Sequence, residues 1–112
     1  SKGLKPSVQL RLKMYDSYHD ATATGDGQYD SFMKAVSSIY ASLHKDLPKL
    51  VDYHVTIPPG GKTDAFVETV ITWEYGGRFK TKGLDPDQTV AAMMATEKML
   101  NIMDKNPKEI HP

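Results

Sequence analysis

The 112-residue chain contains no cysteine, so it can form no disulfide framework and perform no thiolate chemistry. It also lacks an excess of either charge, because 14 basic residues balance 14 acidic ones. Balanced charge argues against nucleic acid or a membrane surface as the main partner. No apolar run approaches the ~18 residues of a membrane span, and the first residues carry no signal-peptide pattern. We therefore expect a cytoplasmic protein.

The motifs of self-sufficient active sites are missing as well. The four histidines do not pair as H-x-H or H-x-x-x-H, and without cysteine a zinc site would need distant carboxylates. The sequence contains no G-x-S-x-G, no Walker loop and no complete G-x-G-x-x-G. We predict no catalytic residue, no metal site and no cofactor in this chain.

Hydrophobic periodicity predicts an α+β fold in the order β-β-α-β-β-β-α. Val8 to Met14 alternates apolar and polar side chains without a break, which is typical of a half-buried strand. The simplest arrangement has two layers, an antiparallel sheet with both helices on one face. The other predicted elements are strands over 19–24, 50–57, 65–75 and 78–82, a helix from Gln28 to Leu43, and a last helix with Asp85 as its N-cap and Pro86 as its first residue.

A glycine turn precedes each predicted helix. Gly25-Asp26-Gly27 follows the strand that ends at Thr24, and Gly83 precedes Asp85-Pro86-Asp87. This degenerate recurrence predicts an internal pseudo-repeat, in which one supersecondary unit is used twice. We expect a linker from a longer protein over 1–7, one domain over 8–105 and a flexible tail over 106–112.

A series of short motifs resembles the allosteric domain of 2-isopropylmalate synthases and citramalate synthases. Ala21 to Gly27, with Asp30 and Phe32, resembles the G-D-G-x-x-D-A motif of that family, although Ser31 replaces its usual alanine. The series covers roughly residues 8–104 and is most similar to the bacterial citramalate synthase branch. The other matching segments are Leu50-Val51-Asp52-Tyr53-His54-Val55, Thr63-Asp64-Ala65 and Gly83-Leu84-Asp85-Pro86-Asp87.

The resemblance implies a regulatory domain that follows a TIM-barrel catalytic domain. That catalytic domain would condense acetyl-CoA with a 2-keto acid and would hold the divalent metal. The resemblance also implies a homodimer and an end-product amino acid as effector. The effector would be isoleucine in a citramalate synthase, which we favour, or leucine in a 2-isopropylmalate synthase.

Three kinds of contact would hold such an amino acid. Backbone N–H groups at a helix start suit its carboxylate, and we expect Gly27, Gln28 and the turn from Pro86 to Gln88 to supply them. Asp30 is expected to accept its ammonium group. The aliphatic chain is expected to lie in an apolar pocket, over which Thr63 and Asp64 could close and into which Gln88 could reach. The expected pocket residues are Tyr29, Leu50, Tyr53, Ile57 and Val67.

Three other interpretations share part of this pattern. A dimerisation module without a ligand would have every feature except a reason for Asp30 and the paired glycine turns. A double-stranded RNA-binding domain shares the order α-β-β-β-α from Gln28 onward, but the acids of Asp85-Pro86-Asp87 would repel phosphate at the start of its last helix. A standalone enzyme would need a catalytic constellation that the sequence lacks.

Overall fold

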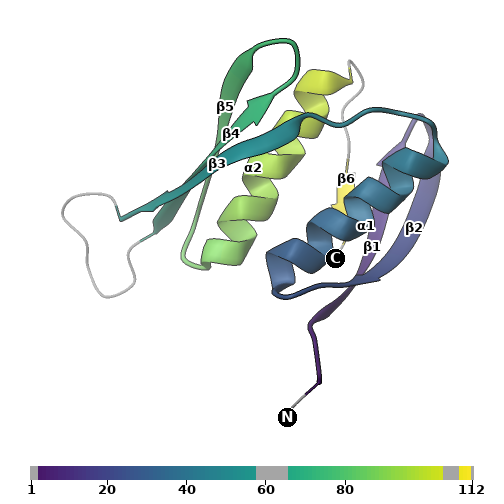
Figure 1. Ribbon diagram of the computed structural model, residues 1–112, viewed down its shortest axis with the longest axis horizontal. Coiled ribbons are helices and arrows are strands. Elements are labelled where there is room, and N and C mark those ends of the chain that lie inside the picture. The colour runs from purple at the N-terminus through teal and green to yellow at the C-terminus, as the bar shows by residue number, and fades with distance from the viewer. Residues whose placement is uncertain (1–2, 58–65, 105–108, 112) are drawn as a thin grey trace. The chain divides into compact units, whose positions relative to one another are not determined.

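The strands pair in two separate antiparallel sheets, and each sheet has its own helix. A computed structural model describes residues 3–57, 66–104 and 109–111. The chain divides into a first unit, Ser1–Leu47 with Lys105–Pro112, and a second unit, Pro48–Asp104. Figure 1 labels the elements of both units.

The first unit is built on the hairpin of β1 (Ser7–Met14) and β2 (Ser17–Thr24). Both residues of its tight turn, Tyr15 and Asp16, have positive φ angles of 53° and 64°, as hairpin turns that match the strand twist require. Helix α1 (Gln28–Ser42) lies against these two strands (Figure 1). The apolar side chains of β1 and α1 that form its core are Leu10, Leu12, Met14, Phe32, Ala35, Val36, Ile39 and Tyr40, each at most 2% exposed.

A third strand completes the first sheet. β6 (Glu109–His111) pairs antiparallel with β1 opposite residues 11–13, which gives the order β2-β1-β6. The sequence predicts a flexible tail over 106–112, whereas the structure forms a strand within it. Periodicity over three residues carries too little signal to predict a strand, and the edge of β1 away from β2 offers unpaired backbone groups.

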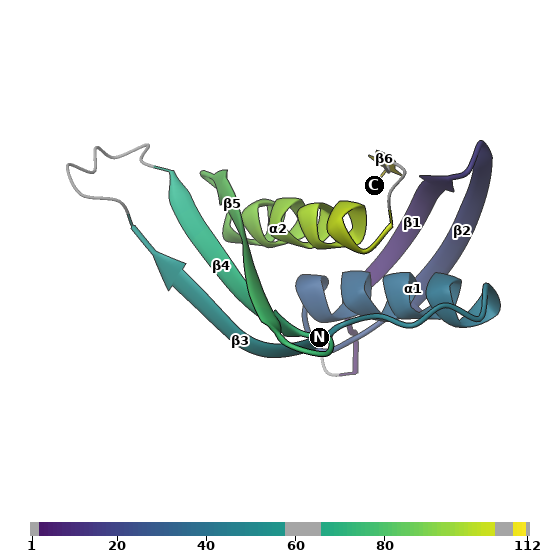
Figure 2. The same cartoon turned by 90° about the horizontal axis from the view of Figure 1, so that it is seen from above.

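The second unit consists of β3 (Lys49–Thr56), β4 (Val67–Glu74), β5 (Arg78–Asp85) and α2 (Gln88–Met103). The strands pair in the order β3-β4-β5, and α2 lies along β4 and β5 (Figure 2). Ile71 and Trp73 of β4 are fully buried. The indole N–H of Trp73 donates to Oγ1 of Thr81 over 2.9 Å, which satisfies the polar atom of this large core side chain.

The α+β class, the antiparallel pairing and the predicted order of elements are confirmed, with β6 added. The expected single sheet is instead two sheets, because β3 pairs with β4 and not with β1 or β2. Of Asp26 and Gly27, the two caps that the sequence allows for the first helix, Gly27 is the N-cap of α1. The predicted N-cap of the last helix is wrong. β5 extends through Asp85, which pairs with Val67, and Asp87 caps α2.

The two repeated glycines both lie where a side chain would not fit. A Cβ atom on Gly25 would collide with the Asp30 carboxylate and lie 2.8 Å from the backbone nitrogen of Ser31. A Cβ atom on Gly83 would collide with the backbone carbonyl of Ala91 in α2. In each unit, glycine therefore lets the chain before the helix approach the helix closely.

Candidate functional site

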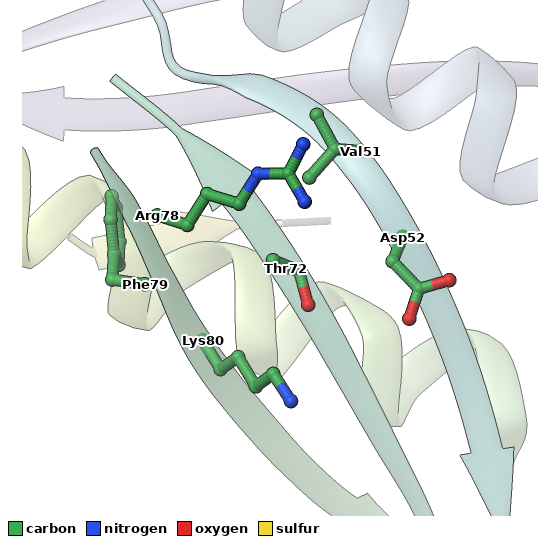
Figure 3. Close-up of a pocket in the computed structure, with 6 residues that line it drawn as sticks. All are labelled: Val51, Asp52, Thr72, Arg78, Phe79 and Lys80. Carbon is green, nitrogen blue, oxygen red and sulfur yellow. The ribbon is translucent and has the colours of Figure 1, made fainter. Parts of the chain in front are cut away.

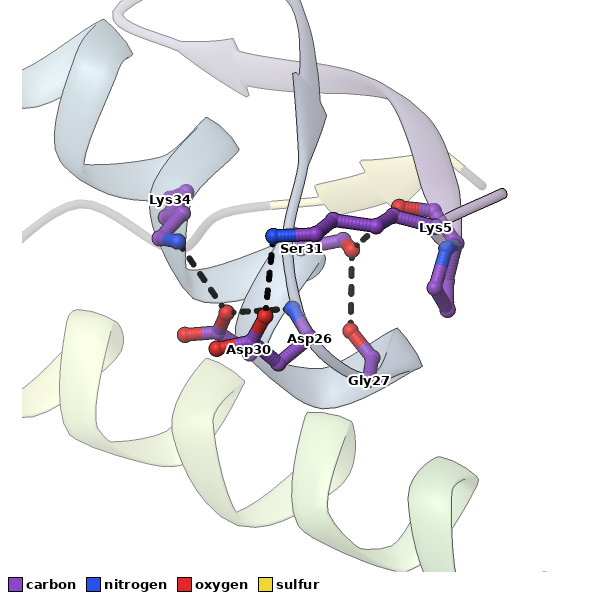
Figure 4. Close-up of polar contacts among 7 residues, drawn as sticks. Lys5, Asp26, Gly27, Asp30, Ser31 and Lys34 are labelled. Carbon is purple, nitrogen blue, oxygen red and sulfur yellow. Dashed lines mark hydrogen bonds and ion pairs between the residues drawn. The ribbon is translucent and has the colours of Figure 1, made fainter. Parts of the chain in front are cut away.

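Four charged side chains form a cluster at the turn before α1 (Figure 4). They are Lys5, Asp26, Asp30 and Lys34. The backbone N–H of Asp26 donates to Oδ2 of Asp30 over 2.8 Å. The same carboxylate oxygen lies 3.2 Å from Nζ of Lys34, one helical turn later. Lys5 forms a second ion pair, of 3.2 Å, with Asp26. The turn therefore holds Asp30 by a backbone contact and by a cation.

These contacts keep Asp30 ionised. The hydrogen bond from the Asp26 N–H, followed by that from Lys34, lowers the pKa of Asp30 below its ordinary value of 3.8. The carboxylate is 43% exposed. The Asp26 N–H and the Lys34 ammonium both contact Oδ2, so Oδ1 has no partner among the described residues and is accessible to a cationic ligand group.

The two helix starts differ in what satisfies their backbone N–H groups. Asp87 caps α2, since its Oδ1 accepts from the N–H groups of Thr89 at 2.8 Å and Val90 at 3.3 Å. At α1 the cap is Gly27, which has no side chain to accept such bonds. The first turn of α1 thus offers N–H donors to an external anion, whereas a carboxylate of the chain itself occupies the start of α2.

Ser31 is a residue of this turn for which the sequence gave no role. It is fully buried, and its Oγ lies 2.8 Å from the carbonyl oxygens of both Pro6 and Gly27 (Figure 4). The Pro6 carbonyl also accepts from the N–H of Gly25 at 3.2 Å. The Ser31 side chain therefore links the start of α1 to Pro6, the residue before β1. Its departure from the usual alanine of the resembled motif was the signal that could have revealed this role.

The candidate residues of the sequence fall in both units. Gly27, Gln28, Tyr29 and Asp30 are consecutive at the start of α1, and the ring of Tyr29 lies 5.9 Å from that of Phe32. The residues expected to bind the carboxylate and the ammonium are therefore adjacent in the first unit. Tyr29 is half-buried.

The remaining candidates belong to the second unit. Three are half-buried, namely Leu50, Tyr53 and Val67, and three are exposed, namely Ile57, Pro86 and Gln88. Leu50 pairs with Trp73 and Tyr53 with Ile71, so these two candidates share the sheet face that carries the core of the unit. Gln88 is the first residue of α2, and Pro86 lies in the turn before it. Thr63 and Asp64 lie outside the described residues.

No group of three or more histidine, aspartate or glutamate side chains in residues 3–57, 66–104 and 109–111 could hold a metal ion. Over the same residues, neither helix is long and apolar enough to cross a membrane.

The chain is thus built of two helix-on-sheet units, with a polar turn before a helix that has no side-chain cap. The chain belongs to the LeuA allosteric (dimerisation) domain family, whose model matches residues 1–103. It is similar to a 2-isopropylmalate synthase of Methylococcus capsulatus, with 31% identity over 108 residues. That match covers 96% of this chain but 20% of the relative, so the chain spans about a fifth of the protein it resembles.

Proposed function

We propose that this chain is a regulatory domain that binds a branched-chain amino acid and inhibits an acyltransferase of which it is a part. The observation that carries the proposal is the family match over residues 1–103, which includes a helix start without a side-chain cap beside an ionised Asp30. The helix start suits the carboxylate of a free amino acid, and Asp30 suits its ammonium group.

The carboxylate of the effector is proposed to bind the first turn of α1. Its donors are the backbone N–H groups at Gly27 and Gln28, which the positive end of the helix dipole reinforces. The start of α2 is a poorer candidate, because Asp87 already occupies it. Gly27 and Gln28 are therefore favoured over the Pro86–Gln88 turn, although the sequence indicates both as carboxylate contacts.

The ammonium group is proposed to bind Oδ1 of Asp30. The lowered pKa keeps this acid charged throughout the neutral range, and a charge-assisted hydrogen bond to it is stronger than one between neutral groups. Contacts of the aliphatic side chain with Tyr29 stay a prediction. The same holds for the second-unit set of Leu50, Tyr53, Ile57, Thr63, Asp64, Val67 and Gln88.

The identity of the effector rests on two observations that point to different branches. The series of motifs favours isoleucine and a citramalate synthase, as the sequence predicts. The name of the Methylococcus capsulatus relative favours leucine and a 2-isopropylmalate synthase. The two amino acids differ in the position of one methyl group, which a pocket distinguishes by about 1–3 kcal/mol.

We infer the properties of the rest of the protein from the family to which this chain belongs. The acyltransferase would condense acetyl-CoA with a 2-keto acid in a separate TIM-barrel domain, which would hold the divalent metal. The domain described here would form a homodimer, as the family description supports, and would act in the cytoplasm. Inhibition requires that the effector bind one state of the enzyme better than the other.

Isothermal titration calorimetry with isoleucine, leucine and valine tests the proposal. Asp30→Asn keeps an oxygen that can accept the Asp26 N–H but removes the charge, so it should weaken binding about tenfold or more. Asp46→Asn is the matched control, because this exposed acid of the same unit has no partner among the described residues. Full affinity in Asp30→Asn would refute the ammonium assignment, and no binding of any of the three would refute the sensor.

A further inference from the structure

A second place for a small charged molecule lies on the open face of the second unit. A hollow of about 510 Å³ is lined by Val51, Asp52, Thr72, Arg78, Phe79 and Lys80, shown in Figure 3. These residues come from all three strands, β3, β4 and β5. α2 lies behind the strands in that view, while the charged side chains project from the other side. The volume is in the ~300–1,000 Å³ range of small-molecule sites.

The sheet register explains why opposite charges flank this hollow. Asp52 pairs with Thr72, and Thr72 pairs with Lys80, so the three form one row across the sheet. Neighbouring strands lie ~4.8 Å apart, which separates the backbones of the acid and the lysine by about 10 Å. Thr72 forms the floor between them and is 8% exposed. Among the described residues, neither Asp52 nor Lys80 has an ion-pair partner.

Arg78 adds a second cation that is already oriented. Its Nε lies 3.1 Å from Oε1 of Glu74, and this bond leaves the two terminal nitrogens of the guanidinium without a partner among the described residues. In Figure 3 the guanidinium extends over the middle strand toward Val51. A guanidinium oriented by its contact with Glu74 suits a carboxylate, which it can bind through two parallel hydrogen bonds.

We propose that this hollow binds a free α-amino acid or a zwitterion of similar size. Arg78 and Lys80 receive its carboxylate, Asp52 receives its ammonium, and Val51 contacts its apolar part. The charges of Arg78 and Lys80 are offset by those of Asp52 and Glu74, so the hollow favours a molecule with both charges over a simple anion. This site goes beyond the proposed effector site and shares no residue with it.

The test is a titration followed by amide NMR spectra of this chain. L-Leucine should shift the amide signals of Asp52, Thr72, Arg78 and Lys80 with a saturating curve. 4-Methylpentanoate lacks the ammonium and 3-methylbutylamine lacks the carboxylate, so each should produce about a fivefold weaker response or less. Sodium chloride at matched ionic strength controls for screening of exposed charges.

Three variants separate this site from its surroundings and from the effector site. Asp52→Asn and Lys80→Gln should each weaken the response about fivefold. Lys82→Gln is the matched control, since Lys82 is exposed on the same strand two residues further on and does not line the hollow. Asp30→Asn should leave the four shifts intact even if it abolishes binding at α1. The proposal is overturned if the four amides do not respond saturably, if sodium chloride reproduces the response, or if both charge variants bind as the unaltered chain does.

Discussion

The backbone N–H of Asp26 donates a 2.8 Å hydrogen bond to Oδ2 of Asp30, so the first acid of α1 is folded back onto the turn that precedes the helix. Gly25 makes room for this arrangement, because a side chain there would collide with the same carboxylate. The acid therefore does two things at once. It stabilises the turn through Oδ2 and leaves Oδ1 accessible at a helix start that has no side-chain cap.

The first prediction concerns the dependence of stability on pH. The hydrogen bond from Asp26 and the contact with Lys34 lower the pKa of Asp30 in the folded chain. A group with a lowered folded pKa contributes stability above its ordinary pKa, and this contribution is lost as pH falls through the lowered value. Asp30→Asn should therefore melt at a lower temperature than the unaltered chain near neutral pH. The difference should begin to shrink as pH falls below the ordinary value of 3.8 and should disappear below the lowered pKa of the folded chain.

Thermal melts of both chains between about pH 7 and about pH 2.5 measure this difference. Asp46→Asn serves as the control and should track the unaltered chain at each pH. A gap between Asp30→Asn and the unaltered chain that stays constant down to the lowest pH would contradict the electrostatic origin of the contribution.

The second prediction concerns the close contact of Gly83 with α2. Gly83→Ala would place a methyl group on the carbonyl of Ala91, and backbone cannot move aside as a flexible side chain does. The overpacking should lower the free energy of unfolding by about 1–3 kcal/mol or more. Gly77→Ala is the matched control, because a Cβ there meets nothing within 4 Å. Its effect should stay within about 0.5 kcal/mol.

Urea denaturation followed by tryptophan fluorescence reports on this unit directly, since Trp73 is the one tryptophan of the chain and is fully buried. Equal midpoints for the two alanine variants would show that α2 does not approach β5 as closely as described.

The third prediction compares two buried threonines of the second sheet. Thr81→Val removes the acceptor of the Trp73 indole N–H and should destabilise the fold by about 1–3 kcal/mol. Thr69 is also fully buried, but its Oγ1 has no hydrogen-bond partner among the described residues. Thr69→Val removes that polar atom at constant shape and should stabilise the fold by about 1 kcal/mol. The same urea experiment measures both. Shifts in the same direction would contradict the assignment of these polar contacts.

The fourth prediction concerns the N-cap of α2. Asp87→Ala removes the acceptor of the Thr89 and Val90 N–H groups and should cost about 0.5–2 kcal/mol. Asp87→Asn keeps an accepting oxygen and should recover most of the loss. Thermal melts of the two variants make the comparison. If Asp87→Ala melts at the same temperature as the unaltered chain, the N–H groups of Thr89 and Val90 do not depend on Asp87 for a hydrogen-bond acceptor.

Structural features that depend on residues close together in the sequence were predicted from the sequence. The alternation in Val8–Met14 identified β1 and its buried residues, because the period of two is the period of a strand. The glycine turn predicted Asp26 or Gly27 as the cap of the helix after it, and Gly27 is the cap. The i,i+4 spacing of Asp30 and Lys34 is also readable in the sequence, and it accounts for part of the lowered pKa.

The features that the sequence did not predict depend on long-range pairing or on competing local signals. The choice of β4 rather than β1 as partner of β3 is a long-range choice that periodicity does not encode. Asp85 and Asp87 both have the chemistry of a cap, and the pairing of Asp85 with Val67 decides between them. The row of Asp52, Thr72 and Lys80 exists through the register of three strands.

The measurement that tests the central claim most directly is a thermal melt of this chain with isoleucine, leucine, valine or no addition. An amino acid at 100 times its dissociation constant adds ~2.7 kcal/mol to the stability of the form that binds it. For a chain of this size the midpoint should then rise by on the order of 10 °C. We predict such a rise with one branched-chain amino acid, isoleucine for a citramalate synthase or leucine for a 2-isopropylmalate synthase. The same midpoint in all four samples would contradict an amino-acid sensor and would favour a dimerisation module without a ligand.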